Sequence, residues 1–321
     1  MAVILSSTDV IDLLTFDEAI DVTERVYRDS NVEDRRVHSP VRMKLPRGSL
    51  RIVTGALLND NVMGARLGSA SGLAGNMSPI VLFEADSGNI LAIMAYPFSI
   101  MRTGVTVAVG TKWISPEAAT TAALIGAGRN ALSALEGMIA VRPITAATVY
   151  SRTAEKRDAL ADIATRKFGI PVTAVGNSDE AVADADLIAC VTSATDHVFD
   201  PAKVLRDVHV NSVGSVNEVP DAIFRAAAGI FLGSKKQELQ YAHYHSFAGD
   251  APRNALLELI ETGEIDWDAV HDLDAALKGW SRPRPGPTVF KETRGGVGDV
   301  ALAHFAYERA RELGRGLPLQ L

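Results

Sequence analysis

The sequence predicts an α/β protein of two domains, one with an antiparallel sheet and one with a doubly wound parallel (Rossmann) sheet. The first hundred residues contain short runs with the alternation of half-buried strands, whereas strands alternate with helices after about residue 115. A glycine-rich turn of the dinucleotide-binding type follows at residues 126–131. The length of 321 residues and the 47% hydrophobic content fit two domains with full cores.

The N-terminal elements carry clear local signals. Thr15-Phe-Asp-Glu18 is a capping box and predicts a helix to about Ser30. Five short strands are expected next, at Val41–Leu45, Leu50–Leu57, Val62–Leu67, Ile80–Glu84 and Ile90–Ala95. The period becomes helical from Ser99 to Trp113.

An apolar strand beginning near Thr121 runs into Gly126-x-Gly128-x-x-Ala131 and then into a helix over residues 130–140. Gly126 permits the tight turn, Gly128 lets the backbone approach a pyrophosphate, and Ala131 lets the helix pack closely on the sheet. The first N–H groups of that helix would then face the phosphates. The motif predicts a dinucleotide site, and the alternative is an ordinary glycine-rich turn in a βαβ unit.

The rest of the chain continues the alternation of strands and helices. Strands are expected at Ala147–Tyr150, Val172–Val175, Leu187–Val191, His209–Val213 and Gly229–Leu232, with helices at Thr153–Phe168 and Ser178–Ala183. Residues 238–276 read as helical, 281–287 as an irregular proline-rich link, and 298–314 as an amphipathic final helix that could return to the first domain.

The residues after the second strand of the Rossmann domain bear on the choice of nucleotide. A carboxylate there would bind the ribose 2′-hydroxyl of NAD, but the sequence reads Tyr150-Ser-Arg-Thr153. The guanidinium of Arg152 and the hydroxyls of Ser151 and Thr153 suit a 2′-phosphate, which favours NADP(H) over NAD(H). The alternative is that Arg152 is an exposed side chain in the loop of an NAD-dependent protein.

Composition argues against several classes of partner. The net charge of −7 and the absence of a Lys/Arg cluster argue against nucleic acid. No apolar run approaches a membrane span and residues 1–5 lack a basic flank, so we expect a cytoplasmic protein that binds a small molecule and no membrane. The single Cys190 reads as a buried strand position. His243-x-His245 has no Cys or acid partner at ligand spacing, and no metal is expected.

Several arginines could bind an anionic substrate. Arg42 lies on the predicted strand Val41–Leu45 and Arg66 on the predicted strand Val62–Leu67 of the same sheet. Arg102 lies in the first turn of a helix, which is unfavourable for a cation unless a bound carboxylate sits between its guanidinium and the helix N–H groups. Each arginine taken alone is more often a solvated surface charge.

Motifs spread along the chain identify a family. They are Leu91-Ala-Ile-Met-Ala95, Met101-Arg-Thr-Gly-Val-Thr-Val-Ala-Val-Gly-Thr-Lys112, Leu124-Ile-Gly-Ala-Gly128, Val213-Gly214 and Thr288-Val-Phe-Lys291, with Asp299 near the C-terminus. Together they closely resemble the ornithine cyclodeaminase/mu-crystallin family. The resemblance implies that the Rossmann domain (residues 116–294) is inserted in an α+β domain whose antiparallel sheet is built from both chain ends (residues 1–115 and 295–321). Members dimerise through that domain, so a homodimer is expected.

The resemblance also implies roles for individual residues. Arg102 matches the arginine that holds the substrate α-carboxylate, Arg42 a second carboxylate contact, and Lys291 a residue that could donate a proton or orient the substrate. The expected nucleotide contacts are Thr103, Gly126, Gly128, Arg129, Asn130, Ala131, Ser151, Arg152, Thr153, Thr192, Ser193, Val213 and Gly214. For Thr192 and Ser193, a capped turn explains the sequence equally well.

Two departures from the family pattern bear on the reaction. Gly64-Ala-Arg66 stands where a lysine is usual, so Arg66, expected to bind substrate and act in catalysis, cannot lose a proton as lysine can. The acid that follows Val-Gly in cyclodeaminases is absent until Glu218, which favours a reductase. We expect NAD(P)H-dependent reduction of a 2-imino acid, reversible as an amino-acid dehydrogenase. The alternatives are a cyclodeaminase-type lyase, an alanine dehydrogenase or cyclic ketimine reductase, and a non-catalytic NADPH-binding protein.

The number of arginines expected at the site predicts how many carboxylates the substrate carries. Arg294 stands where the family commonly has glycine, so Arg66 and Arg294 add two guanidiniums to Arg42 and Arg102. Four buried guanidiniums repel one another unless anions neutralise them. This predicts a dicarboxylic imine, with iminosuccinate giving aspartate as the best guess. The alternative is that Arg66 merely replaces lysine and Arg294 points to solvent.

Overall fold

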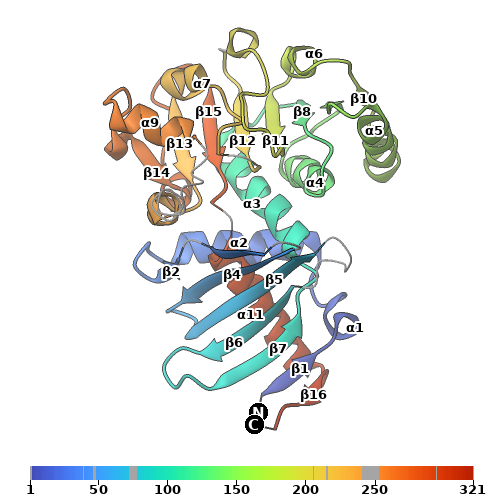
Figure 1. Cartoon of the computed structure of the whole chain (residues 1–321), viewed down its shortest axis with the longest axis vertical. Helices are drawn as coiled ribbons and strands as arrows, with labels where there is room; N and C mark the ends of the chain where they lie inside the picture. Colours follow the sequence, from blue (N-terminus) through green and yellow to red (C-terminus); the bar gives the residue numbers. More distant parts are fainter. Residues whose placement is uncertain are drawn as a thin grey trace. The chain divides into compact units, whose positions relative to one another are not determined.

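The computed structural model describes residues 2–38, 40–45, 48–71, 78–204, 206–214, 216–240, 253–293 and 295–320. It divides into two units, each with its own internal packing. Unit 1 comprises Met1–Arg102, Lys236–Tyr244 and Arg294–Leu321, and unit 2 comprises Thr103–Lys235 and His245–Thr293. Each unit contains one sheet, which confirms the predicted α/β class (Figure 1). Among the described helices, none is long and apolar enough to cross a membrane.

Unit 1 is built on a mostly antiparallel sheet. Its elements are β1 (Val3–Leu5), α1 (Ser7–Val10), α2 (Phe16–Asp29), β2 (Arg35–Val37), β3 (Val41–Leu45), β4 (Gly48–Leu57), β5 (Val62–Ser71), β6 (Pro79–Glu84), β7 (Ile90–Ala95), the start of α3 (Ser99–Ile114), α11 (Val297–Glu312) and β16 (Leu317–Pro318). The strand order is β16-β1-β7-β6-β5-β4-β2, with β3 paired to β4. Helix α11 packs on β4, β5 and β6, and α2 packs on α11 (Figure 1).

The two chain ends join the sheet of unit 1 through strands that the sequence did not reveal. β1 pairs with β7 in parallel, and β16 pairs with β1 in the opposite direction. The expectation of a purely antiparallel sheet is therefore corrected at β1. These strands span three and two residues, too few to show an alternating pattern, so only their tertiary pairing defines them. They place the N- and C-termini side by side (Figure 1).

Unit 2 is a doubly wound parallel sheet. Its elements are the rest of α3, β8 (Thr121–Ile125), α4 (Ala131–Val141), β9 (Ala146–Tyr150), α5 (Ala154–Phe168), β10 (Val172–Ala174), α6 (Ser178–Val182), β11 (Leu187–Cys190), the short 3₁₀ helix Pro201–Lys203, β12 (His209–Ser212), α7 (Asp221–Ala226), β13 (Gly229–Leu232), α9 (Ala255–Glu261), the 3₁₀ helix Trp267–Ala269, β14 (Val270–Asp272), α10 (Leu273–Leu277) and β15 (Thr288–Lys291). The order is β10-β9-β8-β11-β12-β15-β13-β14, and each neighbouring pair is parallel.

Two cores form on the two faces of this sheet because successive strand residues point to opposite sides. Leu124 of β8 packs with Leu135 and Met138 of α4 in one core. Its neighbour Ile125 packs in the other core, which includes residues of α6, α7 and α9. Strands buried on both faces explain why β8 and β11 read as continuous apolar runs.

The region predicted as helical over residues 238–276 is corrected. It contains α9, α10 and an edge strand, β14, that pairs in parallel with β13; residues 241–252, with His243 and His245, lie outside the described residues. β15 was also not predicted as a strand, although it lies between β12 and β13. Both strands are four residues or fewer, so pairing with neighbours rather than local periodicity decides their conformation.

The division between the units falls within α3 and not near residue 115. Only the first turn of this helix belongs to unit 1, and from Thr103 onward it belongs to unit 2. The reason is close packing on α4: a methyl group at Gly104 would overlap the backbone of Ser133, and one at Gly137 would overlap the backbone of Gly104. Residues 236–240, expected in the Rossmann domain, belong to unit 1.

Candidate functional site

A cleft of about 490 Å³ lies at the carboxyl ends of β8, β9 and β11 in unit 2. The strand order runs from β8 to β9 on one side and to β11 on the other, and such a switch point is where α/β sheets bind ligands. The cleft is lined by Ile125–Gly128, Tyr150–Thr153, Lys156, Ser178, Val191–Ala194 and Asp196–Val198.

The fingerprint turn has the geometry that a bound pyrophosphate needs. Gly126 has φ of 111°, and a Cβ there would lie 2.9 Å from the carbonyl oxygen of Val191. A Cβ at Gly128 would meet nothing closer than 3.7 Å, so protein packing does not require this glycine and the space beside it is open. Asn130 begins α4 without a side-chain cap, and Ala131 is fully buried. The turn therefore fits a dinucleotide.

Positive charge gathers where the loop after β9 borders the cleft. Ser151, Arg152 and Thr153 line it, as expected, and Lys156 and Ser178 join them. Lys156 was not among the predicted site residues. Its spacing of four residues from Arg152, at the start of a helix, is the sequence signal for it. The lining contains one carboxylate, from Asp196 in a different loop.

The loop after β11 forms the other wall of the cleft, and the loop after β12 is joined to it through Glu218. Thr192 and Ser193 line the cleft. Val213 and Gly214 follow β12, and their N–H groups donate to Glu218 Oε1 at 3.1 and 2.8 Å. Burial raises the pKa of the Glu218 carboxyl to about 7, although hydrogen bonds from Thr192 and Gly214 act to lower it.

The remaining expected residues of unit 2 lie near this edge but outside the cleft lining. Arg129 and Asn130 follow the fingerprint turn, with Arg129 exposed. Thr103 is buried in α3 beside Gly104, which packs on the first turn of α4. Lys291 is 3% exposed and ends β15 in register with Ser212 of β12, so it lies at the same sheet edge as Val213.

Unit 1 brings two of the predicted arginines together around a carboxylate. Arg66 of β5 donates from Nε to Asp299 Oδ2 at 2.8 Å, and Arg102 Nε lies 3.4 Å from Asp299 Oδ1. All three side chains are buried, and the guanidinium of Arg66 lies over the ring of buried Tyr96. Gly295 and Gly298 permit the close approach of this chain segment to Arg102.

The charges of this cluster explain its ionisation. Burial favours the neutral acid, but the positive charges of Arg102 and Arg66 keep the pKa of Asp299 below its usual value. Burial, together with the negative charge of Asp299, raises the pKa of the Tyr96 hydroxyl well above its ordinary value. The cluster thus holds two guanidiniums, one carboxylate and a protonated phenol.

The expectation that the buried arginines are neutralised only by bound ligands is wrong, because Asp299 neutralises part of their charge. The protein supplies one anion itself, so Arg66 and Arg102 leave an excess of one positive charge. Arg42 is exposed on β3 and reaches Ser49 Oγ at 3.5 Å; its register places it on the same sheet face as Arg66. Arg294 lies outside the described residues.

A parallel sheet with a glycine fingerprint, in a chain whose second unit holds a buried Arg-Arg-Asp cluster, defines a two-unit α/β protein of the dinucleotide-binding class. The sequence model of the ornithine cyclodeaminase/mu-crystallin family matches residues 2–313. The chain belongs to this family, as its motifs predicted.

One characterised relative and two solved structures show which proteins of the family this chain is similar to. A Delta(1)-pyrroline-2-carboxylate reductase of Bacillus cereus (strain ZK / E33L) is 31% identical over 245 residues, 74% of this chain and 72% of that protein. The structure of Thermococcus litoralis Delta(1)-pyrroline-2-carboxylate reductase with NADH and L-proline has a TM-score of 0.85 at 25% identity, covering 99% of this chain and all of that one. The Paracoccus denitrificans iminosuccinate reductase with NAD+ has a TM-score of 0.86 at 21% identity, covering 100% and 99% of the two chains, and supports the fold.

Proposed function

We propose that the protein catalyses NAD(P)H-dependent reduction of a 2-imino acid to an L-amino acid. It is an oxidoreductase acting on C=N bonds. The observation that carries the proposal is the fingerprint cleft of unit 2 in a chain that is 31% identical to a reductase of a cyclic imino acid. When bound, the nicotinamide would supply the hydride for the C=N carbon, and the protein would supply orientation and charge.

We propose roles for one lysine of unit 2 and two arginines of unit 1. Arg102 binds the α-carboxylate, in a bidentate geometry that guanidinium groups favour. Arg66 stabilises negative charge and transfers no proton, because a guanidinium stays protonated. Lys291, at the sheet edge beside Ser212, is the proposed proton donor.

For the substrate we propose a 2-imino acid with one carboxylate, such as a cyclic imine, ahead of iminosuccinate. The excess of one positive charge left by Asp299 matches a single carboxylate. Iminosuccinate is the second candidate, because Arg42 shares a sheet face with Arg66 and would supply a further charge.

The test is an assay of purified protein with NADPH or NADH and the imines of pyruvate and oxaloacetate, and with Delta(1)-pyrroline-2-carboxylate. A reductase consumes the reduced nucleotide in proportion to product. Ammonia release from ornithine without net consumption would establish a cyclodeaminase instead. Nucleotide binding without turnover of any imine would leave a non-catalytic binding protein, and a preference for the oxaloacetate imine would support the diacid.

For the cofactor we propose a preference for NADP(H). Arg152 and Lys156 can both pair with a 2′-phosphate, and the wall that they form contains no carboxylate for a ribose 2′-hydroxyl. Removing both cations (R152A with K156A) should raise the KM for NADPH by about 10- to 100-fold and leave that for NADH within about two-fold. K167A, on the same helix but outside the cleft lining, is the control. A higher kcat/KM with NADH in the wild type would refute the preference.

We also propose a homodimer formed through the sheet of unit 1. The face opposite α11 carries rows of partly exposed apolar side chains across neighbouring strands: Val41, Ile52 and Leu67 in one row, and Ala65, Val81 and Ile93 in the next. A contiguous apolar face of this kind is typical of an interface. Light scattering should report a dimer for the wild type and a monomer for V81E, whereas I163E, on exposed α5 of unit 2, should remain dimeric. A monomeric wild type would exclude the dimer.

A further inference from the structure

Glu218 joins the two loops that follow β11 and β12 in unit 2. Its side chain is fully buried. Oε2 accepts hydrogen bonds from the N–H and the hydroxyl of Thr192 at 3.0 and 2.9 Å. Oε1 accepts from the Ser212 hydroxyl and from the N–H groups of Val213 and Gly214, at 3.1, 3.1 and 2.8 Å. Both oxygens are thus fully used, each by a different loop.

The same carboxylate fixes a wall of the nucleotide cleft. Thr192 lines the cleft, and its Cγ2 would lie 3.2 Å from a Cβ placed on Gly126 of the fingerprint turn. On the other side, a methyl group at Gly214 would overlap the backbone of Thr192 and lie 2.8 Å from Glu218 Oε2. Glu218, the two loops and the fingerprint turn therefore form one continuous contact.

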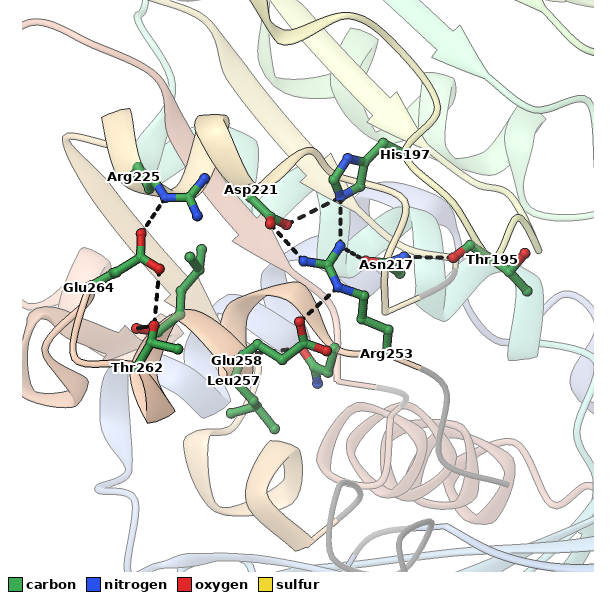
Figure 2. A network of polar contacts seen from close by, with 12 residues as sticks. Thr195, His197, Asn217, Asp221, Arg225, Arg253, Leu257, Glu258, Thr262 and Glu264 are labelled. Atoms are coloured by element: carbon green, nitrogen blue, oxygen red, sulfur yellow. Dashed lines mark hydrogen bonds and ion pairs between the residues drawn. The ribbon is translucent and has the colours of Figure 1, made fainter. Parts of the chain in front are cut away.

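The segment around Glu218 holds the rest of the cofactor loop, defined here as residues 192–198. The Val198 N–H donates to the Glu218 carbonyl at 3.1 Å, and Asn217 Nδ2 donates to the Thr195 carbonyl at 2.6 Å. Figure 2 shows the outer layer of this arrangement, in which Arg253 contacts Asn217 at 3.3 Å and pairs with Asp221. The cofactor loop is thus attached to residues 217–218 at three points.

We propose that Glu218 is a positioning residue for the dinucleotide, holding the cofactor loop in the shape that receives it. This inference rests on the proposed function. A carboxylate is required because three backbone N–H groups and two hydroxyls need acceptors on both oxygens. Glutamine has one acceptor oxygen, and its NH2 group would face N–H donors, so one of the two loops would be released.

The test compares two carboxylates that contact opposite ends of β11: Glu218 accepts from Thr192 beyond its carboxyl end, and Asp186 lies before its amino end. Asp186 precedes β11 and accepts from the N–H groups of Thr120 and Thr121 at 2.8 and 3.0 Å, at the sheet edge away from the cleft. E218Q and D186N each replace a carboxylate that accepts backbone hydrogen bonds, fully buried at Glu218 and half-buried at Asp186. Dissociation constants for NADPH and NADH are measured by nucleotide fluorescence on the full-length protein without substrate, together with Tm.

E218Q should weaken nucleotide binding at least ten-fold, whereas D186N should lower Tm and change the dissociation constant by less than two-fold. Binding by E218Q within two-fold of the wild type would overturn the positioning role. If E218Q does not fold, S212A tests the same role, because it removes one hydrogen bond to Glu218 from a side chain outside the cleft lining. S212A should bind the nucleotides two- to five-fold more weakly. Unchanged binding by S212A would overturn the positioning role. A wild type that binds neither nucleotide would overturn the proposed function as well.

Discussion

At the residue scale, Asp299 sets the electrostatics of unit 1. The Asp299 carboxylate accepts a hydrogen bond from Arg66 and forms an ion pair with Arg102 in a buried position, where an unpaired cation would be costly. The excess of one positive charge on this cluster is the reason for proposing that it receives the α-carboxylate of the substrate.

Arg102→Ala should lower kcat/KM for the imine by about 2–4 kcal/mol of transition-state binding, because it removes the proposed carboxylate anchor. Nucleotide affinity should stay nearly unchanged, since Arg102 belongs to unit 1 and the cleft to unit 2. Steady-state kinetics and nucleotide titration check both expectations, with R36A on β2 as an exposed control. An unchanged kcat/KM would remove Arg102 from the site.

Asp299→Asn should shift substrate preference toward a dicarboxylic imine. The substitution raises the excess charge of the cluster from one to two, and a second substrate carboxylate would then find an uncompensated guanidinium. We expect the ratio of kcat/KM for the oxaloacetate imine over the pyruvate imine to rise about ten-fold, an energy of about 1.4 kcal/mol. A ratio that stays the same or falls would contradict the assignment of substrate charge to this cluster.

At the element scale, the crossing of α3 on α4 is a close backbone contact within unit 2. Glycines on both helices, Gly104 and Gly137, leave no room for a side chain. Because α4 begins at the fingerprint turn, this crossing fixes the helix whose N-terminus faces the proposed pyrophosphate. The Arg-Thr-Gly motif resembles a substrate-binding signature, but its glycine, Gly104, is needed for helix packing.

Gly104→Ala should destabilise the protein by about 1–3 kcal/mol or more, because the new methyl group meets the backbone of Ser133, which cannot move aside as a side chain could. Gly176→Ala is the matched control: no heavy atom lies within 4 Å of a Cβ there, and we expect a change within about 1 kcal/mol. Urea denaturation followed by fluorescence measures both. Equal free energies of unfolding for Gly104→Ala and Gly176→Ala would show that α3 and α4 can move apart with little loss of stability.

At the scale of the whole molecule, a polar network inside unit 2 makes stability depend on pH. His209 of β12 is fully buried and contacts Thr288 Oγ1 at 3.0 Å and Asn211 Oδ1 at 3.3 Å. Burial lowers its pKa from 6.5 to about 3, so the folded protein holds it neutral. The unfolded chain takes up a proton below pH 6.5, and the stability that neutral His209 contributes above that pH is lost as the pH falls toward 3.

Between pH 7 and pH 4.5, the wild type should therefore lose about 2–3 kcal/mol more stability than H209Q. Glu218 acts in the opposite direction, because its raised pKa of about 7 favours the protonated folded state as the pH falls. Its effect is common to both proteins and cancels in the comparison. Denaturation curves at the two pH values give the difference. Parallel pH dependence of wild type and variant would show that His209 is protonated in the folded state.

The sequence by itself determined the parts of this protein that depend on local patterns. The capping box at Thr15, the strand β7 and the Gly126 fingerprint each carry their signal within a few residues, and the structure has them where expected. The family motifs predicted that a parallel Rossmann sheet and a second, antiparallel sheet occur in one chain. Local physics suffices for such features, because caps, periodicity and glycine turns involve neighbouring residues only.

Tertiary structure alone decided the features that join distant segments. The short strands β1, β14, β15 and β16 exist through their partners, and the unit boundary within α3 follows from contact with α4. The pairing of Arg66 with Asp299 spans 233 positions, and the five hydrogen bonds of Glu218 join loops that follow two different strands, β11 and β12. No local pattern encodes such contacts, because burial and charge compensation arise only once the chain has folded.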